Sequence, residues 1–363
     1  MTRLNIAHSR LSNQQIADAA FDQPGDVVKW LVAVQAQDYL GALWAVGLRT
    51  RNTTEKEIER ALADRTIVRT WPMRGTLHFV AAPDVRWILK LLAPRVISGS
   101  ASRSKQLELD DATFSRSKKV FVRVLQGGKQ LEREEMYQVL ESAHISTEGQ
   151  RGIHILGRLA QEGVLCFGAR AGKQHTFALL DEWVPKSRVL ERDAALAELT
   201  QRYFASHGPA TLQDFVWWSG LSTADAREGL ELAKPQLVRE IVAGQTYWLG
   251  TSTSGTKNKV KNAYLLPGFD EYLVGYKDRS AVLNPLFARQ TNNGGGILNP
   301  TIVINGQVVG TWKRTLQKNT VVITPLWFTS PKKSDLRSLA IAAQQYGDFL
   351  GLPAAIQENG RLA

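Results

Sequence analysis

The chain contains two kinds of hydrophobic pattern, and their order predicts its architecture. In some stretches apolar residues recur every three or four positions, which is typical of amphipathic helices. In others apolar and polar residues alternate, which is typical of half-buried strands. Helical stretches followed by a short two-stranded hairpin occur three times before residue 250. Because a winged helix has this order of elements, the pattern predicts three winged-helix modules in tandem.

The first copy carries the clearest signals. Residues 26–34 have Val27, Trp30, Leu31 and Val34 at helical spacing and predict a helix. Thr54 followed three residues later by Glu57 predicts the capped start of another helix. Two alternating stretches then surround four turn-forming residues and predict a hairpin. These stretches are 67–71 and 76–80, with the turn at 72–75.

The second and third copies repeat this order. The second is predicted to contain helices at 114–125, 131–142 and 152–161 and a hairpin of 164–167 and 175–179. Arg170 and Lys173 lie in the turn of that hairpin. In the third copy, Thr211 with Asp214 and Ser222 with Asp225 predict two helix starts. Its hairpin is predicted at 237–242 and 246–249.

After residue 250 the pattern changes to short strands, predicted at 263–266, 301–304, 308–312 and 320–324. Asn305-Gly306 predicts a type I′ hairpin turn, because both residues tolerate a positive φ. A final helix is predicted at 333–350. The fold class is therefore α+β, with three tandem winged-helix modules followed by a small C-terminal β-barrel. The predicted boundaries are 1–100, 101–188, 189–250 and 251–363.

Composition excludes several classes of protein. A chain of 363 residues with 44% hydrophobic and 22% charged residues is ordinary for a soluble globular protein. The single cysteine, Cys166, excludes intramolecular disulfides, and the six histidines show no metal-ligand spacing. No signal peptide and no long apolar run is present. We therefore expect a cytoplasmic protein without a metal, a cofactor or a membrane partner.

The chain is strongly basic, with a formal net charge of +11 and a sequence pI of about 9.7. Such a charge favours a polyanionic partner, because bound phosphates release condensed counterions. Together with the predicted winged helices it indicates nucleic acid. The alternative is a basic surface that serves only solubility.

Two glutamines, Gln35 and Gln37, follow the first predicted helix. Side chains two residues apart point in nearly opposite directions on a helix but share a face of an extended segment. Joint action therefore requires the helix to end near Val34. An amide both donates and accepts hydrogen bonds, so such a pair can hold a water molecule, although neither is a useful base. The alternative is that both amides bond the local backbone.

Several motifs together resemble a known family. They are Gln35-Ala36-Gln37 and the segments 69–78, 269–280 and 310–314. The chain resembles, over nearly its whole length, the tandem winged-helix DNA glycosylases of the AlkZ and YcaQ type. The resemblance implies that Gln35 and Gln37 are the catalytic pair. That family has glutamine or aspartate at the second position, and glutamine places this chain with the AlkZ-like branch; a register shifted onto Asp38 stays open.

The resemblance implies three winged helices around DNA, a C-terminal barrel and excision of alkylated purines, including crosslinked ones. We therefore expect a monomeric, monofunctional glycosylase that hydrolyses the N-glycosidic bond of N7- or N3-alkylated purines in double-stranded DNA. An alkylated purine is cationic and departs as a neutral base, so it needs no general acid. Two alternatives are a non-enzymatic winged-helix regulator and an RNA-binding role.

Other residues of these motifs suggest further roles. We expect DNA contacts from Arg69, Arg74, His78, Arg170 and Lys173, the arginines and the lysine through phosphates. Because residues alternate between the faces of a strand, some side chains of this hairpin must serve the core instead. Asp270, Asp278 and Arg279 predict an internal ion-pair network in the barrel. Lys257, Lys259 and Lys261 form a basic linker that is either solvated or follows phosphates.

Overall fold

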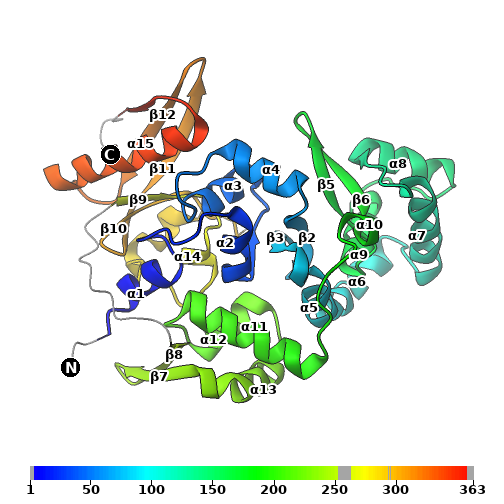
Figure 1. The fold of residues 1–363 in the computed structure, drawn as a ribbon, viewed down its shortest axis with the longest axis horizontal. Helices are drawn as coiled ribbons and strands as arrows, with labels where there is room; N and C mark the ends of the chain where they lie inside the picture. The colour runs from blue at the N-terminus through cyan, green and yellow to red at the C-terminus, as the bar shows by residue number, and fades with distance from the viewer. Residues whose placement is uncertain (1–3, 252–262, 293, 295, 358–363) are drawn as a thin grey trace.

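The structure of the protein is a computed structural model that describes residues 4–251, 263–292, 294 and 296–357. It has a mixed α and β fold in which the N-terminal segment is central (Figure 1). The helices between residues 111 and 161 with the hairpin of residues 165–179 lie on one side of it, and the C-terminal sheet lies on the other. The basic linker at 257–261 falls outside the described residues.

The central segment differs from its prediction at one decisive point. The helix predicted at 26–34 ends at Leu31, and the next residues form a strand instead of completing the helix to Val34. Val32 turns the chain with a φ of 69°, and the following residues pair with the hairpin, so sheet formation overrides the helical spacing. The elements are α1 (Ile6–Asn13), α2 (Pro24–Leu31), β1 (Ala33–Gln35), α3 (Tyr39–Gly47), α4 (Glu55–Ala63), β2 (Ile67–Met73) and β3 (Thr76–Ala81).

Other local signals in this segment are confirmed. The carboxylate of Glu57 accepts a hydrogen bond from the main-chain nitrogen of Thr54 at 2.7 Å, as a capping box requires. The hairpin turns at Arg74-Gly75, both of which have positive φ. The sequence did not predict the long helix α5 (Val85–Gly99), whose Pro94 lies inside it, or α6 (Ala101–Gln106).

The next two stretches each contain helices followed by a hairpin. The second comprises α7 (Asp111–Leu125), β4 (Leu131–Glu132), α8 (Arg133–Ser142), α9 (Arg151–Gln161), β5 (Leu165–Ala171), β6 (Gln174–Leu179) and α10 (Leu180–Trp183). The third comprises α11 (Arg192–His207), α12 (Leu212–Ser219), α13 (Thr223–Ala233), β7 (Leu237–Val242) and β8 (Gln245–Gly250). The helix starts predicted at Thr211 and Ser222 are confirmed, because each residue is the N-cap of its helix. The long helix α11 was not predicted.

The C-terminal strands form one open sheet in the order β13-β12-β11-β10-β9. Because β13 and β9 both lie at edges, this sheet does not close into the predicted barrel within the part of the chain that the structure describes. Asn305 and Gly306 have φ values of 51° and 79°, which confirms the predicted type I′ turn. The elements are β9 (Ala263–Leu266), α14 (Glu271–Val274), β10 (Thr301–Ile304), β11 (Gln307–Gln317), β12 (Thr320–Trp327), α15 (Lys333–Leu350) and β13 (Ala354–Ile356).

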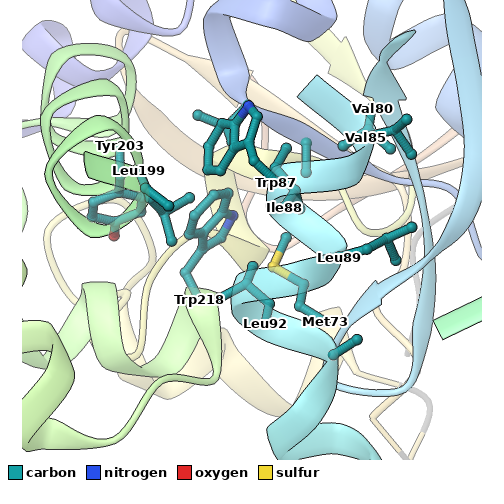
Figure 2. Close-up of a cluster of buried hydrophobic side chains, with 14 of the residues drawn as sticks. Met73, Val80, Val85, Trp87, Ile88, Leu89, Leu92, Leu199, Tyr203 and Trp218 are labelled. Carbon is teal, nitrogen blue, oxygen red and sulfur yellow. The ribbon is translucent and has the colours of Figure 1, made fainter. Parts of the chain in front are cut away.

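The buried cores cross the predicted module boundaries. One cluster joins Val80 of β3 and Trp87 of α5 to Tyr203 of α11 and Trp218 of α12 (Figure 2). A second joins α2 and α3 to the C-terminal sheet and α15. A third packs Trp71 and Leu77 of the central hairpin against α7–α9. The central hairpin therefore has a stabilising contact with each neighbouring part of the chain.

Among the residues that the structure describes, no helix combines the length and the apolar character needed to cross a bilayer.

The two type I′ turns at Asn305-Gly306 and Ala243-Gly244 make a matched pair. Their glycines have nearly equal φ, 79° and 80°, but a Cβ on Gly306 would lie 2.9 Å from the Cβ of Ala7, whereas Gly244 has open space. We expect Gly244→Ala to destabilise the fold by about 1 kcal/mol through its backbone alone. Gly306→Ala should cost about 1–3 kcal/mol more because of overpacking. Urea unfolding of both variants measures the difference, and equal losses would contradict the contact with α1.

Candidate active site

The two glutamines lie at the edge of the central sheet. This sheet has the order β1-β3-β2, and Gln35 is the cross-strand partner of His78, which in turn pairs with Thr70. Cross-strand partners share a face, so these three side chains lie on one side of the sheet. The chain stays beside β3 past Gln35, because the main-chain nitrogen of Ala36 donates to the oxygen of Leu77 at 2.7 Å. The chain is therefore extended through Gln35 and still lies beside β3 at Ala36, and residue 37 follows in a bend.

The two amides have different surroundings. Gln37 is exposed, and its side-chain oxygen accepts a hydrogen bond from the main-chain nitrogen of Leu77 at 3.2 Å. The side-chain oxygen of Gln35 is buried and receives no hydrogen bond from the part of the chain that the structure describes. A buried acceptor without a partner is destabilising, so such an atom is a place where a water molecule or a ligand can bind.

Two charged side chains hold the main chain of this segment. The carboxylate of Glu271, at the start of α14, accepts from the main-chain nitrogen of Gln35 at 3.1 Å. The guanidinium of Arg69, on β2, donates to the oxygen of Ala36 from Nε at 3.2 Å and from Nη2 at 2.9 Å. An anion on the N–H and a cation on the next C=O complement the peptide dipoles and fix the strand on both sides.

Glu271 is fully buried, and two aromatic side chains bind its other oxygen. Trp218 donates from Nε1 to Oε2 at 2.8 Å, and Nε2 of His207 lies 3.3 Å from the same atom. Burial by itself raises the pKa of this carboxyl. The hydrogen bond with His207 and the nearby charge of Arg74 outweigh that effect, so the net pKa is lowered and Glu271 is ionised.

Arg74 and His78 form a second contact beside Gln35. Nδ1 of His78 lies 3.0 Å from the oxygen of Thr76, which can only accept, so Nδ1 carries the proton. Nε2 is then the acceptor for Nη2 of Arg74 at 3.2 Å. Burial and the charge of Arg74 lower the pKa of His78 to about 3, and burial also lowers the pKa of Arg74. His78 is therefore neutral at neutral pH and is not a general acid.

The expectation of a phosphate contact from Arg69 requires correction. Arg69 is only 6% exposed and lies on the opposite face of the sheet from Gln35. Its guanidinium is 5.1 Å from the ring centroid of Tyr39 and 4.7 Å from that of Phe167, and burial lowers its pKa to about 10. His78 is likewise fully buried. In this conformation neither side chain is available to a phosphate.

The predicted contacts at the second hairpin also differ from each other. Arg170 donates to the carboxylate of Glu59 at 2.6 Å and lies 5.0 Å from the ring of Tyr39, whose hydroxyl donates to the same carboxylate. This contact joins β5 to α4. Lys173 lies in the turn and is exposed. Of the two, Lys173 is the cation free to meet a phosphate.

The predicted ion-pair network of Asp270, Asp278 and Arg279 is wrong in its pairing. Asp270 forms a two-pronged ion pair with Arg49 of the N-terminal segment, with distances of 2.8 and 2.9 Å. Asp278 accepts from the nitrogen of Ser280, and Arg279 donates to the oxygen of Leu273. Asp270 is therefore structural, as expected, but its partner lies more than two hundred residues away.

Asp38 has a defined structural role that bears on the register of the motif. It is the N-cap of α3, and its carboxylate accepts from the nitrogen of Gly41 at 3.2 Å. A Cβ at residue 41 would collide with that carboxylate, so the glycine permits the cap. The helix begins after Asp38, so both glutamines lie before it, Gln35 at the end of β1 and Gln37 in the bend that follows.

Comparison with known proteins defines the class. The model of the AlkZ-like DNA glycosylase family matches residues 28–349, and the chain belongs to this family. It is thus a DNA glycosylase, which disfavours the reading as a non-enzymatic regulator.

Two similar proteins come from Streptomyces sahachiroi. The chain is 28% identical over 336 residues to an interstrand DNA cross-link repair glycosylase, covering 87% of this chain and 88% of the relative. It is similar to the solved structure of the DNA glycosylase AlkZ, with a TM-score of 0.82 and 25% identity, covering 97% of this chain and 98% of that chain.

Glu271 was not identified from the sequence, although it lies inside a motif quoted for the family resemblance. Its neighbour Asp270 is the N-cap of α14 in the structure, but no spacing in the sequence connects Glu271 with Gln35. An acidic residue at a helix start is usually explained by the helix dipole. Only the tertiary contact shows that this one bonds the edge of a distant sheet.

The inward position of Arg69 predicts a separation between stability and DNA binding. Arg69→Met removes both bonds to Ala36 and should destabilise the fold by about 1.5–3 kcal/mol, the range for hydrogen bonds to charged groups. The slope of the logarithm of the DNA-binding constant against the logarithm of the salt concentration should not change. Lys173→Met is the matched control: it should have little effect on stability, and it should reduce the magnitude of that slope by about one. A reduced slope for Arg69→Met would restore the phosphate contact predicted from the sequence.

The burial of neutral His78 predicts a pH dependence of stability. Its native pKa of about 3 lies below the unfolded value of about 6.5, so only the unfolded state binds this proton between those pH values. The stabilisation is complete above pH 6.5 and decreases by about 1.4 kcal/mol per pH unit as the pH falls through that window. As the pH falls from 6.5 to 4.5, the free energy of unfolding of His78→Asn should therefore decrease by about 2 kcal/mol less than that of the wild type. Chemical denaturation at a series of pH values measures both. If the two free energies fall in parallel with pH, His78 takes up its proton in the native protein.

Proposed function

We propose that this protein hydrolyses the C1′–N bond of N7- or N3-alkylated purines in double-stranded DNA, with Gln35 and Gln37 as the catalytic pair. The proposal is carried by one observation. Gln35 ends strand β1, Gln37 follows it and bonds Leu77 of β3, and the buried side-chain oxygen of Gln35 has no partner among the described residues. A water molecule or a substrate atom would satisfy this acceptor.

The geometry suggests how the pair divides its work. The oxygen of Gln37 is occupied by Leu77, which leaves its amide N–H groups to donate to a water oxygen. The oxygen of Gln35 then accepts a hydrogen from the same water. With both positions fixed, a lone pair of the water is directed at C1′. The Gln35 carbonyl dipole also stabilises the positive charge that develops on the sugar.

The reaction balances without an acid or a base from the protein. The C1′–N bond breaks with its electron pair going to the cationic base, which departs neutral. Water then forms the C1′–O bond to an oxocarbenium-like carbon, and the oxonium that results releases its proton to solvent. Neutral His78 and the two amides are compatible with this sequence, because none has to transfer a proton. The product is an abasic site.

Further features of the proposal concern the substrate and its binding. A relative is named as an interstrand cross-link repair glycosylase, and we propose that this chain also unhooks crosslinked purines. The exposure of Gln37 supports access for a bulky adduct. We propose that the three helix-and-hairpin stretches are winged helices around the duplex, that the protein acts as a cytoplasmic monomer, and that Lys173 contacts a phosphate, with Arg74 beside the lesion.

Excision of 7-methylguanine from duplex DNA under single-turnover conditions tests the catalytic pair. Gln35→Ala and Gln37→Ala should each reduce the rate on the order of 10²-fold or more, because the water loses one of its two fixed contacts. DNA affinity should stay within a few-fold of wild type. Gln344→Ala, an exposed glutamine on α15, is the matched control and should excise at the wild-type rate. Unchanged rates in both active-site variants would remove the pair from the mechanism.

A panel of substrates tests the bond that is cleaved. Duplexes with 7-methylguanine, 3-methyladenine and an N7-linked interstrand crosslink should all yield abasic sites, whereas undamaged guanine should not. Tight binding to undamaged and alkylated DNA without any base release would instead support the regulator that the sequence left open.

A further inference from the structure

The described part of the chain contains four fully buried carboxylates, and one of them is paired differently from the others. Asp84 bonds Arg188 and Arg202, Asp214 lies 3.8 Å from Arg10, and Asp270 pairs with Arg49. Glu271 has no arginine or lysine within salt-bridge distance and only His207, at 3.3 Å. A buried anion normally requires a paired cation, because desolvation strongly disfavours the isolated charge. Glu271 is the exception.

This exceptional carboxylate is also the one that contacts the candidate catalytic segment. Its Oε1 bonds the main-chain nitrogen of Gln35, the residue whose own side-chain oxygen is unpaired. Its Oε2 is held by Trp218, so the carboxylate has a fixed orientation beneath the strand. Both oxygens accept hydrogen bonds, from Gln35 at one and from Trp218 at the other, but no arginine or lysine bonds to the carboxylate. Arg74, whose charge also stabilises Glu271, bonds to His78 instead.

The reaction itself brings a further positive charge close to this carboxylate. Cleavage of the glycosidic bond leaves positive charge on the deoxyribose, next to the amide that Glu271 positions. A fixed anion in a water-poor site stabilises such charge more strongly than it would in water, since little screening intervenes. We propose that Glu271 is a positioning residue that holds Gln35 in place and whose incompletely paired negative charge stabilises the cationic sugar. This inference rests on the function proposed above.

Two abasic-site analogues separate the charge of Glu271 from its shape. DNA with a pyrrolidine analogue carries a protonated ring nitrogen, whereas DNA with tetrahydrofuran is neutral and of similar shape. We expect the wild type to bind the pyrrolidine duplex more tightly, and Glu271→Gln to reduce the ratio of the two affinities about tenfold. Its single-turnover excision of 7-methylguanine should fall about 10²-fold, with tetrahydrofuran affinity within threefold of wild type. A structural role alone would weaken both duplexes equally and leave the ratio unchanged, which would overturn the proposal.

Asp84→Asn provides the matched control. Asp84 is buried to the same degree and accepts from the indole of Trp87 at 2.9 Å, as Glu271 does from Trp218, but it does not contact the glutamine segment. It should lose thermal stability while the affinity ratio stays at the wild-type value. If the affinity ratio falls equally in Asp84→Asn and Glu271→Gln, the effect comes from a general loss of fold stability, and the proposal is overturned.

A second variant decides the matter if Glu271→Gln does not fold. Glu271→Asp keeps the charge but draws it back from Gln35, so it should keep the affinity ratio within threefold of wild type while excision slows at least tenfold. Loss of the ratio in this variant would contradict the role of the charge. The outcomes also separate the two proposals. If the wild type releases no 7-methylguanine, the proposed function fails; if only Gln35 and Gln37 matter and Glu271→Gln excises normally, the role of Glu271 fails alone.

Discussion

The hydrogen bond from the main chain of Gln35 to the carboxylate of Glu271 is the contact on which the arrangement of the site depends. β1 is an edge strand, and an edge strand presents N–H groups that no neighbouring strand satisfies. When such a group is buried it needs a partner from elsewhere in the fold. Here that partner is an ionised side chain at the start of α14. The C-terminal region therefore completes the edge of a sheet that belongs to the N-terminal segment.

The opposite side of the same segment is held by Arg69 in a complementary way. Its guanidinium bonds the oxygen of Ala36 and lies against the rings of Tyr39 and Phe167, one from α3 and the other from β5. The buried clusters follow the same plan, since the central hairpin packs against α7–α9 on one side and against α11 and α12 on another. The position of the site therefore depends on contacts with several parts of the chain and not on the N-terminal segment alone.

The sequence predicted the features that depend on neighbouring residues. The capping box at Thr54, the type I′ turn at Asn305 and the limits of the last helix were all predicted from a few adjacent positions. The end of α2 was not, because Val34 has both the spacing of a helix and the β-branched side chain of a strand, and pairing with Phe79 of β3 decides between them.

In the candidate site, too, the sequence predicted local features and missed those that depend on tertiary contacts. The glutamines were identified from their spacing and the family resemblance, whereas Arg69 was expected to contact phosphate. Whether its side chain points inward depends on Tyr39 and Phe167, which no local pattern connects with it. Glu271 was missed for a related reason, since its contact with Gln35 joins residues 236 positions apart.

That separation has a consequence for the order in which the protein becomes active during its synthesis. The strand with the glutamines leaves the ribosome early, but its carboxylate partner follows 236 residues later. A chain released before α14 is made has no acceptor for the main-chain nitrogen of Gln35, so this edge of the central sheet stays incomplete. The site that we propose is therefore assembled only after most of the chain has been translated.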